Sequence, residues 1–241
     1  MKPLVTFIVS VFIAALLNGC SQLETALRDV DLSELDYGKR NALDEKTIIA
    51  GLKEALRVGS GRAVKRTASL NGYLGNKLIR ITTPDELLKV TRALRKIGLD
   101  KEVDKFEVAM NRAAEKSAGQ ARDLLWSTIK QMQLRDVRKI WKGNDRAATD
   151  YFRNKTERDL YKRFHPVVLT QMNETGLYRA HKKIMAKYMK IPFVKKPEFD
   201  LDRYITRKTL DGLFTVLAQE EARIRKDPVA RTTDLLRKVF G

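Results

Sequence analysis

The sequence has little of the chemistry on which most enzymes depend. It contains one cysteine, Cys20, so no internal disulfide can form, and only two histidines, His165 and His181. A metal centre needs several clustered ligands, which two separated histidines do not supply. No Gly-x-Ser-x-Gly, His-Glu-x-x-His, phosphate-loop or dinucleotide-binding pattern occurs in the sequence. The sequence therefore predicts no metal ion, no cofactor and no recognisable catalytic residue.

Long hydrophobic runs are equally scarce, and the one that stands out lies at the N-terminus. It extends from Leu4 to Leu17 and follows Met1-Lys2-Pro3. Its length of about 14 residues falls short of the roughly 20 apolar residues that a helix needs to cross a bilayer. A basic start, a short apolar core and a small residue before the cut are typical of a secretory signal. We therefore expect residues 1–19 to be a signal peptide.

The end of this run resembles the lipobox of bacterial lipoproteins. The residues are Leu17-Asn18-Gly19-Cys20, of which Asn18 departs from the usual Ala, Ser, Thr or Val. The resemblance implies cleavage before Cys20 and a diacylglycerol on its thiol. Ser21, where an inner-membrane lipoprotein has Asp, implies anchoring at the outer membrane, facing the periplasm. The alternative is a signal anchor or an ordinary secretory peptide with a chance cysteine.

Acidic residues are few relative to basic ones. The chain has 48 lysines and arginines against 30 aspartates and glutamates, a net charge of +18. Such a charge usually suggests nucleic acid, but export argues against that partner. The anionic partners outside the cytoplasm are lipid headgroups, lipopolysaccharide and peptidoglycan, and a protein surface is a further candidate. A solvated basic surface with no dedicated ligand is the alternative.

The pattern of apolar residues is that of helices throughout. No segment alternates with period two, and Leu78–Ile81 is the only short extended stretch. We predict an all-α protein, with a tether over residues 20–43 and a single compact domain of about eight or nine helices over residues 44–241.

Local signals indicate where several of these helices begin and end. Thr83 and Asp145 are predicted to cap the N-termini of two helices. Gly59 and Gly61 are expected to interrupt the first helix and to thin or bend it. Pro166 lies inside a helical pattern and is expected to kink or restart it.

Four separate runs resemble one known family. They are 49-IAGLKEALRVG-59, 106-FEVAMNRAAE-115, 147-AATDYFR-153 and 227-DPVARTTDLLRKVFG-241. Together they resemble the family called domain of unknown function 4197, which groups exported bacterial proteins that are often lipoproteins. The resemblance covers about residues 46–241 and implies no established activity, so no functional residue is carried over. This chain departs from the family by being unusually basic around residues 179–196.

The clearest local feature is a basic segment without acids. No aspartate or glutamate occurs between Thr175 and Pro197. The candidate anion-binding residues recur there at helical spacing: Lys182, Lys183, Lys187 and Lys190. We expect them to face solvent beside an apolar face formed by Leu177, Ile184 and Tyr188, as in helices that lie on anionic surfaces. The alternative is a packed helix whose lysines are merely solvated.

A second acid-free span runs from Ala55 to Thr83. Its candidate anion-binding residues are Arg62, Arg66 and Arg80, close to the turn signal Asn71-Gly72. Backbone donors in such a loop could meet a phosphate or a carboxylate.

The function predicted from these features is a non-enzymatic envelope lipoprotein with a basic binding face. The alternative is an envelope hydrolase acting on cell-wall or lipid substrates through paired carboxylates. Glu107 with Glu115, or Asp211 with Glu220, are the pairs that could be proposed, although surface carboxylates at helical spacing are the simpler interpretation.

Overall fold

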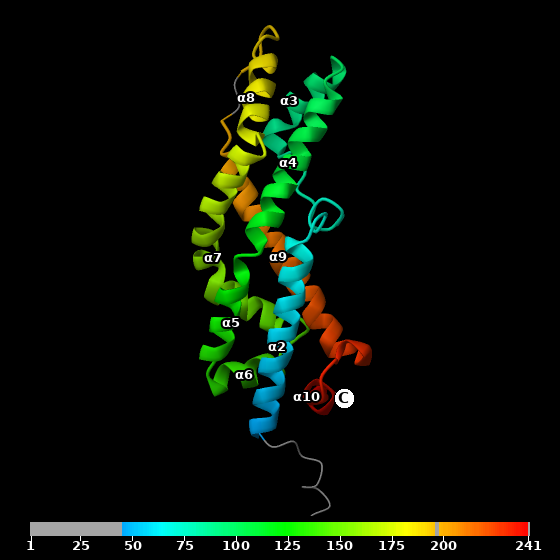
Figure 1. Cartoon of the computed structure of the whole chain (residues 1–241), viewed down its shortest axis with the longest axis vertical. Helices are drawn as coiled ribbons and strands as arrows, with labels where there is room; N and C mark the ends of the chain where they lie inside the picture. The colour runs from blue at the N-terminus through cyan, green and yellow to red at the C-terminus, as the bar shows by residue number, and fades with distance from the viewer. Residues whose placement is uncertain (1–44, 196–197, 241) are drawn as a thin grey trace, which may run out of the picture. The chain divides into compact units, whose positions relative to one another are not determined.

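The computed structural model describes residues 45–195 and 198–240. These residues contain helices and no strand, which confirms the all-α prediction (Figure 1). Residues 45–241 form one compact unit. The signal peptide, Cys20, the tether over residues 20–43 and Asp44 lie outside the described residues.

The helices follow one another with short connections, except where residues 69–84 and 189–200 link them. Their bounds are α2 (Glu45–Ala68), α3 (Asp85–Lys96), α4 (Asp100–Ala118), α5 (Ala121–Gln131), α6 (Leu134–Trp141), α7 (Ala147–Glu174), α8 (Leu177–Tyr188), α9 (Leu201–Lys226), the 3₁₀ helix η1 (Pro228–Ala230) and α10 (Asp234–Phe240). Within the described ranges, none of these helices has the length and apolarity needed to cross a bilayer.

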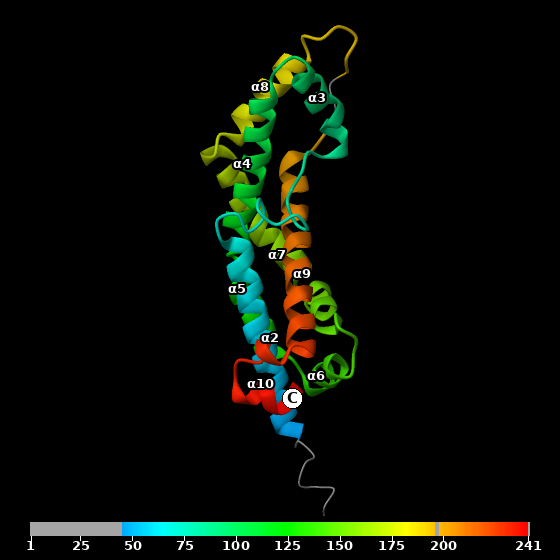
Figure 2. The ribbon, with the colours of Figure 1, turned by 90° about the vertical axis from the view of Figure 1, so that its right-hand side faces the viewer.

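Helix α9 organises the core. It packs on α2, α4 and α7, and Figure 2 shows it running beside α2 and α7. Its inward residues Ile205, Leu213 and Phe214 are completely buried. One apolar cluster extends from Leu52 of α2 to Leu217 of α9 and draws on every helix from α2 to α9. This unit therefore carries its own hydrophobic core, which is the main requirement for independent folding.

The connection between α2 and α3 is held on the surface of α4 by three polar side chains one turn apart. Glu115 accepts hydrogen bonds from the backbone N–H groups of Tyr73 and Leu74, at 3.1 and 3.2 Å. Asn111 exchanges two 2.8 Å hydrogen bonds with the backbone of Ile81. Glu107 accepts a 2.8 Å hydrogen bond from the hydroxyl of Thr83. The short extended stretch Leu78–Ile81 consequently forms turns and coil instead of a strand.

Several predicted boundaries differ from the observed ones. Thr83 does not cap α3, because its hydroxyl donates to Glu107 and Pro84 occupies the N-cap position. Gly59 and Gly61 do not interrupt α2, which is continuous over Glu45–Ala68. Pro166 does not restart the helix either, and α7 continues through it. The buried side chains of Phe164 and Val168 hold both sides of that proline against the same core.

Two glycines permit opposite predictions for the same substitution. A Cβ atom at Gly212 of α9 would lie 2.4 Å from Cε1 of Tyr73, whose ring is completely buried and whose hydroxyl donates to the carbonyl of Thr209. Gly212→Ala should therefore destabilise the protein by about 2 kcal/mol, since overpacking outweighs the gain in helix propensity. Gly61 of α2 has no atom within 4 Å of such a Cβ. Gly61→Ala should instead stabilise by about 0.5–1 kcal/mol.

Urea denaturation of the two variants beside the wild type checks this prediction. Changes of the same sign in both variants would mean that Tyr73 is not packed against Gly212 as described.

Candidate functional site

Helix α8 presents the basic segment that the sequence indicated. Gly176, in a left-handed conformation at φ 72°, separates it from α7. Leu177, Ile184 and Tyr188 form the predicted apolar face, and because all three are buried, α8 is a packed helix and this face does not lie on an anionic surface. This face packs on α3, α4 and α7, which leaves the opposite side of α8 to solvent.

The four candidate lysines of this segment do not all have the same environment. Lys182, Lys183 and Lys190 are exposed. Lys187 is half-buried, and its Nζ lies 3.8 Å from a carboxylate oxygen of Glu102 on α4. Glu102 therefore neutralises part of the charge of Lys187, and the exposed cationic surface rests mainly on the other three lysines.

A small pocket lies where α8 meets α3 and α4. Its volume is about 140 Å³, and its apolar lining includes Leu94 and Ile184, both buried. The charged groups on its lining are Glu102 and Lys105 of α4 and Lys183 and Lys187 of α8. This volume is below the roughly 300 Å³ of a typical small-molecule site. The pocket can accept a small anionic group but not a large substrate.

The three arginines of the second candidate span lie in separate contacts with the protein. Arg66 donates a 2.7 Å hydrogen bond to the buried carboxylate of Glu220. Arg62 donates to the carbonyl of Ala230 and to the hydroxyl of Thr232, both at 3.2 Å. Arg80 lies 3.6 Å from Glu107. Of the three, only Arg66 lines the surface depression formed with residues 69–78, so these arginines are not gathered around one opening.

The carboxylates proposed as hydrolytic pairs differ in burial and in their contacts within the protein. Glu115 and Glu220 are buried, so the expectation of surface positions is wrong for both, whereas Asp211 is exposed. Glu115 holds the backbone of the α2–α3 connection and pairs with Arg112 at 2.6 Å. Asp211 accepts hydrogen bonds from Arg153 at 3.1 and 3.2 Å. Glu220 accepts from Arg66 through Oε1, while its Oε2 is buried without a hydrogen-bond partner among the described residues.

Each of the two histidines contacts another side chain of the protein. His181 stacks on the ring of Phe106, with centroids 6.1 Å apart, at the boundary of the core. Nε2 of His165 lies 2.8 Å from a carboxylate oxygen of Asp202. Burial raises the pKa of Asp202, but hydrogen bonds with Asp200 and His165 outweigh that effect and leave its pKa below the ordinary value. Among the described residues, no group of three His, Cys, Asp or Glu side chains could hold a metal ion.

The structure also has a basic depression between α7 and α9 that was not predicted from the sequence. It has a volume of about 750 Å³ and is lined by Arg153, Arg158, Lys162, Arg207, Glu157 and Asp211, among others. Its residues are far apart in the sequence and are mixed with acids, so no local charge pattern reveals it. Arg153 contacts both acids there, at 3.2 and 3.1 Å, so its own charge is paired within the protein.

The described residues form an all-helical domain. A family model described as "Protein of unknown function (DUF4197)" matches residues 42–241. The chain belongs to that family. No curated protein and no solved structure matches it.

Proposed function

We propose that this protein is a non-enzymatic envelope lipoprotein whose helical domain binds an anionic component of the envelope through α8. The observation that carries the proposal is the exposure of Lys182, Lys183 and Lys190 on a helix whose other face is anchored in the core. Cys20 supplies the membrane anchor, and Ser21 places it at the outer membrane, facing the periplasm. A lysine near an anionic membrane contributes about 1 kcal/mol to binding, so the attraction grows with the number of lysines at the surface and weakens with salt.

The buried face of α8 makes its exposed lysines suited to binding. Because Leu177, Ile184 and Tyr188 fix the rotation of α8, its lysines are presented together and need no folding step before contact. Tyr178 on the same helix is uncharged at neutral pH, and burial and then the nearby Asp202 and Asp200 raise the pKa of its hydroxyl further. An anionic surface therefore meets cations without a competing carboxylate on α8.

Co-sedimentation tests this proposal with three anionic envelope materials. The chain from Ser21 to Gly241 is mixed with phosphatidylglycerol-containing vesicles, lipopolysaccharide or peptidoglycan, at low and high salt. The expected result is binding to at least one material that weakens as salt screens the lysines. Failure to bind any of the three at low salt would contradict the proposal.

The anchor has its own test. Cys20→Ala in the full chain should abolish incorporation of radioactive palmitate and leave the uncleaved precursor, because no other cysteine can accept the diacylglycerol. Ser21→Ala is a suitable control, since it leaves the thiol in place. Palmitate labelling that persists in Cys20→Ala would contradict the lipobox interpretation.

A further inference from the structure

The loop that follows α8 exposes an aromatic side chain completely. Phe193 has a relative exposure of 105%, and its backbone adopts a positive φ of 62°. Bulky residues rarely occupy this left-handed region, because it costs conformational energy that the surrounding structure must offset. Nothing in the described part of the chain covers this ring, so neither burial nor an easy backbone conformation explains it.

Other large apolar side chains are exposed at the same end of the helical unit. Met189, one residue after α8, is 44% exposed, and Ile97, in the turn between α3 and α4, is 58% exposed. Figures 1 and 2 both show the α3–α4 turn and the loop after α8 at the end opposite the first turn of α2. Ile97, Met189 and Phe193 together are called the apolar tip below.

Lysines border the apolar tip. Lys190 and Lys195 flank Phe193 on the loop and are exposed, as are Lys182 and Lys183 on α8. The acids of α3 and α4 are Asp85, Glu86, Asp100, Glu102, Asp104, Glu107 and Glu115, and Glu198 and Asp200 are exposed just before α9. Arg95 lies 2.8 Å from Asp104 and 3.5 Å from Asp100, and Lys187 lies 3.8 Å from Glu102. Arg95 and Lys187 therefore pair with three of these acids, whereas residues 177–195 carry six lysines and arginines and no acid.

We propose that the apolar tip inserts into an anionic lipid bilayer, with Phe193 and Met189 among the lipid headgroups and the surrounding lysines on the phosphates. This proposal rests on the proposed function and names its partner. Aromatic residues favour the interface between headgroups and hydrocarbon, and basic residues next to them bind anionic lipid. A soluble polyanion or peptidoglycan would engage the lysines but would leave Phe193 in water.

Site-specific fluorescence tests the insertion. The chain from Ser21 to Gly241 contains the whole compact unit and no cysteine, so Phe193→Cys provides a single site for an environment-sensitive fluorophore. Val229→Cys is the matched control, because Val229 is 81% exposed on η1. With vesicles of phosphatidylethanolamine and phosphatidylglycerol, the dye at position 193 should shift to the blue and be quenched by brominated lipid. The dye at position 229 should not change.

Affinity supplies a second readout that needs no dye. Phe193→Ser should weaken binding to these vesicles about tenfold, as expected for loss of one large inserted side chain. Val229→Ser should change it less than about twofold, since a scattered exposed apolar residue needs no partner. Circular dichroism of both variants verifies that they are folded.

The outcomes separate this inference from the proposed function. If the protein binds the vesicles in a salt-sensitive way but the dye at position 193 stays in water and Phe193→Ser binds as the wild type does, insertion is wrong and lysine-dependent binding stands. Binding to lipopolysaccharide or peptidoglycan but not to the vesicles also overturns insertion. The protein could also self-associate in the absence of lipid. If Phe193→Ser abolishes that self-association, the apolar tip forms a protein contact and the insertion proposal is wrong.

Discussion

Glu221→Ala is expected to lower the free energy of unfolding by about 3–5 kcal/mol, the cost of removing one partner from a buried ion pair. Glu221 of α9 lies 2.9 Å from Arg225, whose side chain is only 13% exposed. The same carboxylate accepts hydrogen bonds from the backbone N–H groups of Ala148 and Thr149, at 2.9 and 2.8 Å. Its removal leaves a poorly solvated guanidinium and two backbone donors at the start of α7 without their acceptor.

A matched variant separates this effect from the loss of any exposed glutamate. Glu157 lies 3.2 Å from Arg153, but its side chain is 48% exposed. Glu157→Ala should therefore cost less than about 1 kcal/mol, as exposed ion pairs do. Glu221→Gln should fall between the two, because its amide retains one acceptor for the α7 backbone. Urea unfolding curves measure all three, and equal losses for the two alanine variants would contradict the role of Glu221.

Reversing the charge of four lysines at the α8 end is expected to weaken binding to anionic vesicles by about 4 kcal/mol or more, at about 1 kcal/mol for each lysine near the surface. The substitutions are Lys182→Glu, Lys183→Glu, Lys190→Glu and Lys195→Glu, all at exposed positions. Lys187 is left unchanged because it pairs with Glu102, and its reversal would place two acids together. Thermal unfolding should change little, since exposed charges on a helix contribute little to stability.

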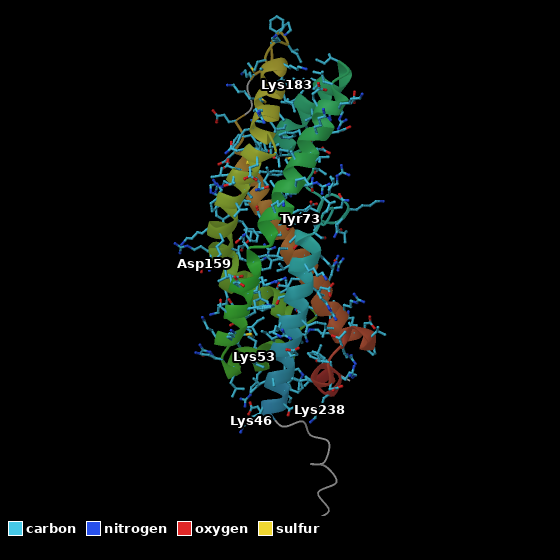
Figure 3. The ribbon with its side chains drawn as sticks, in the orientation of Figure 1. Lys46, Lys53, Tyr73, Asp159, Lys183 and Lys238 are labelled. Carbon is cyan, nitrogen blue, oxygen red and sulfur yellow. The ribbon has the colours of Figure 1, made fainter. Side chains whose placement is uncertain are left out.

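The opposite end of the helical unit supplies the control for this variant. Lys46, Lys139, Lys142 and Lys238 are also exposed, and Figure 3 shows Lys46 and Lys238 far from Lys183. Their replacement by Glu changes the net charge by the same amount. Binding should be retained in this control, apart from a general weakening through the lower net charge. Equal losses in both quadruple variants would show that only the total charge matters and that α8 has no special role.

Local sequence patterns were sufficient to predict much of the fold. The absence of period-two alternation predicted an all-helical domain, and the described residues contain helices and no strand. Apolar spacing and flanking glycines report on neighbouring residues only, so they locate helices well. They also identified the buried face of α8, because Leu177, Ile184 and Tyr188 recur at helical spacing.

Contacts between distant helices could not be predicted in this way. Asp145 was predicted to cap α7, yet Arg146 occupies the N-cap position and its side chain forms no capping hydrogen bond. Glu221 of α9, 72–73 residues later in the chain, supplies the acceptors instead. The pairing of Lys187 with Glu102 and the place of Lys105 in the α8 pocket likewise depend on which helices pack together. A single sequence carries no local signal for that choice.

The most direct test of the binding role of α8 is the affinity of the Ser21–Gly241 chain for anionic and zwitterionic vesicles of equal size, measured across a range of salt concentrations. We expect binding to phosphatidylglycerol-containing vesicles that weakens steadily as salt rises, and little binding to phosphatidylcholine vesicles. Equal binding to both kinds of vesicle, or binding to the anionic vesicles that salt does not weaken, would contradict this role.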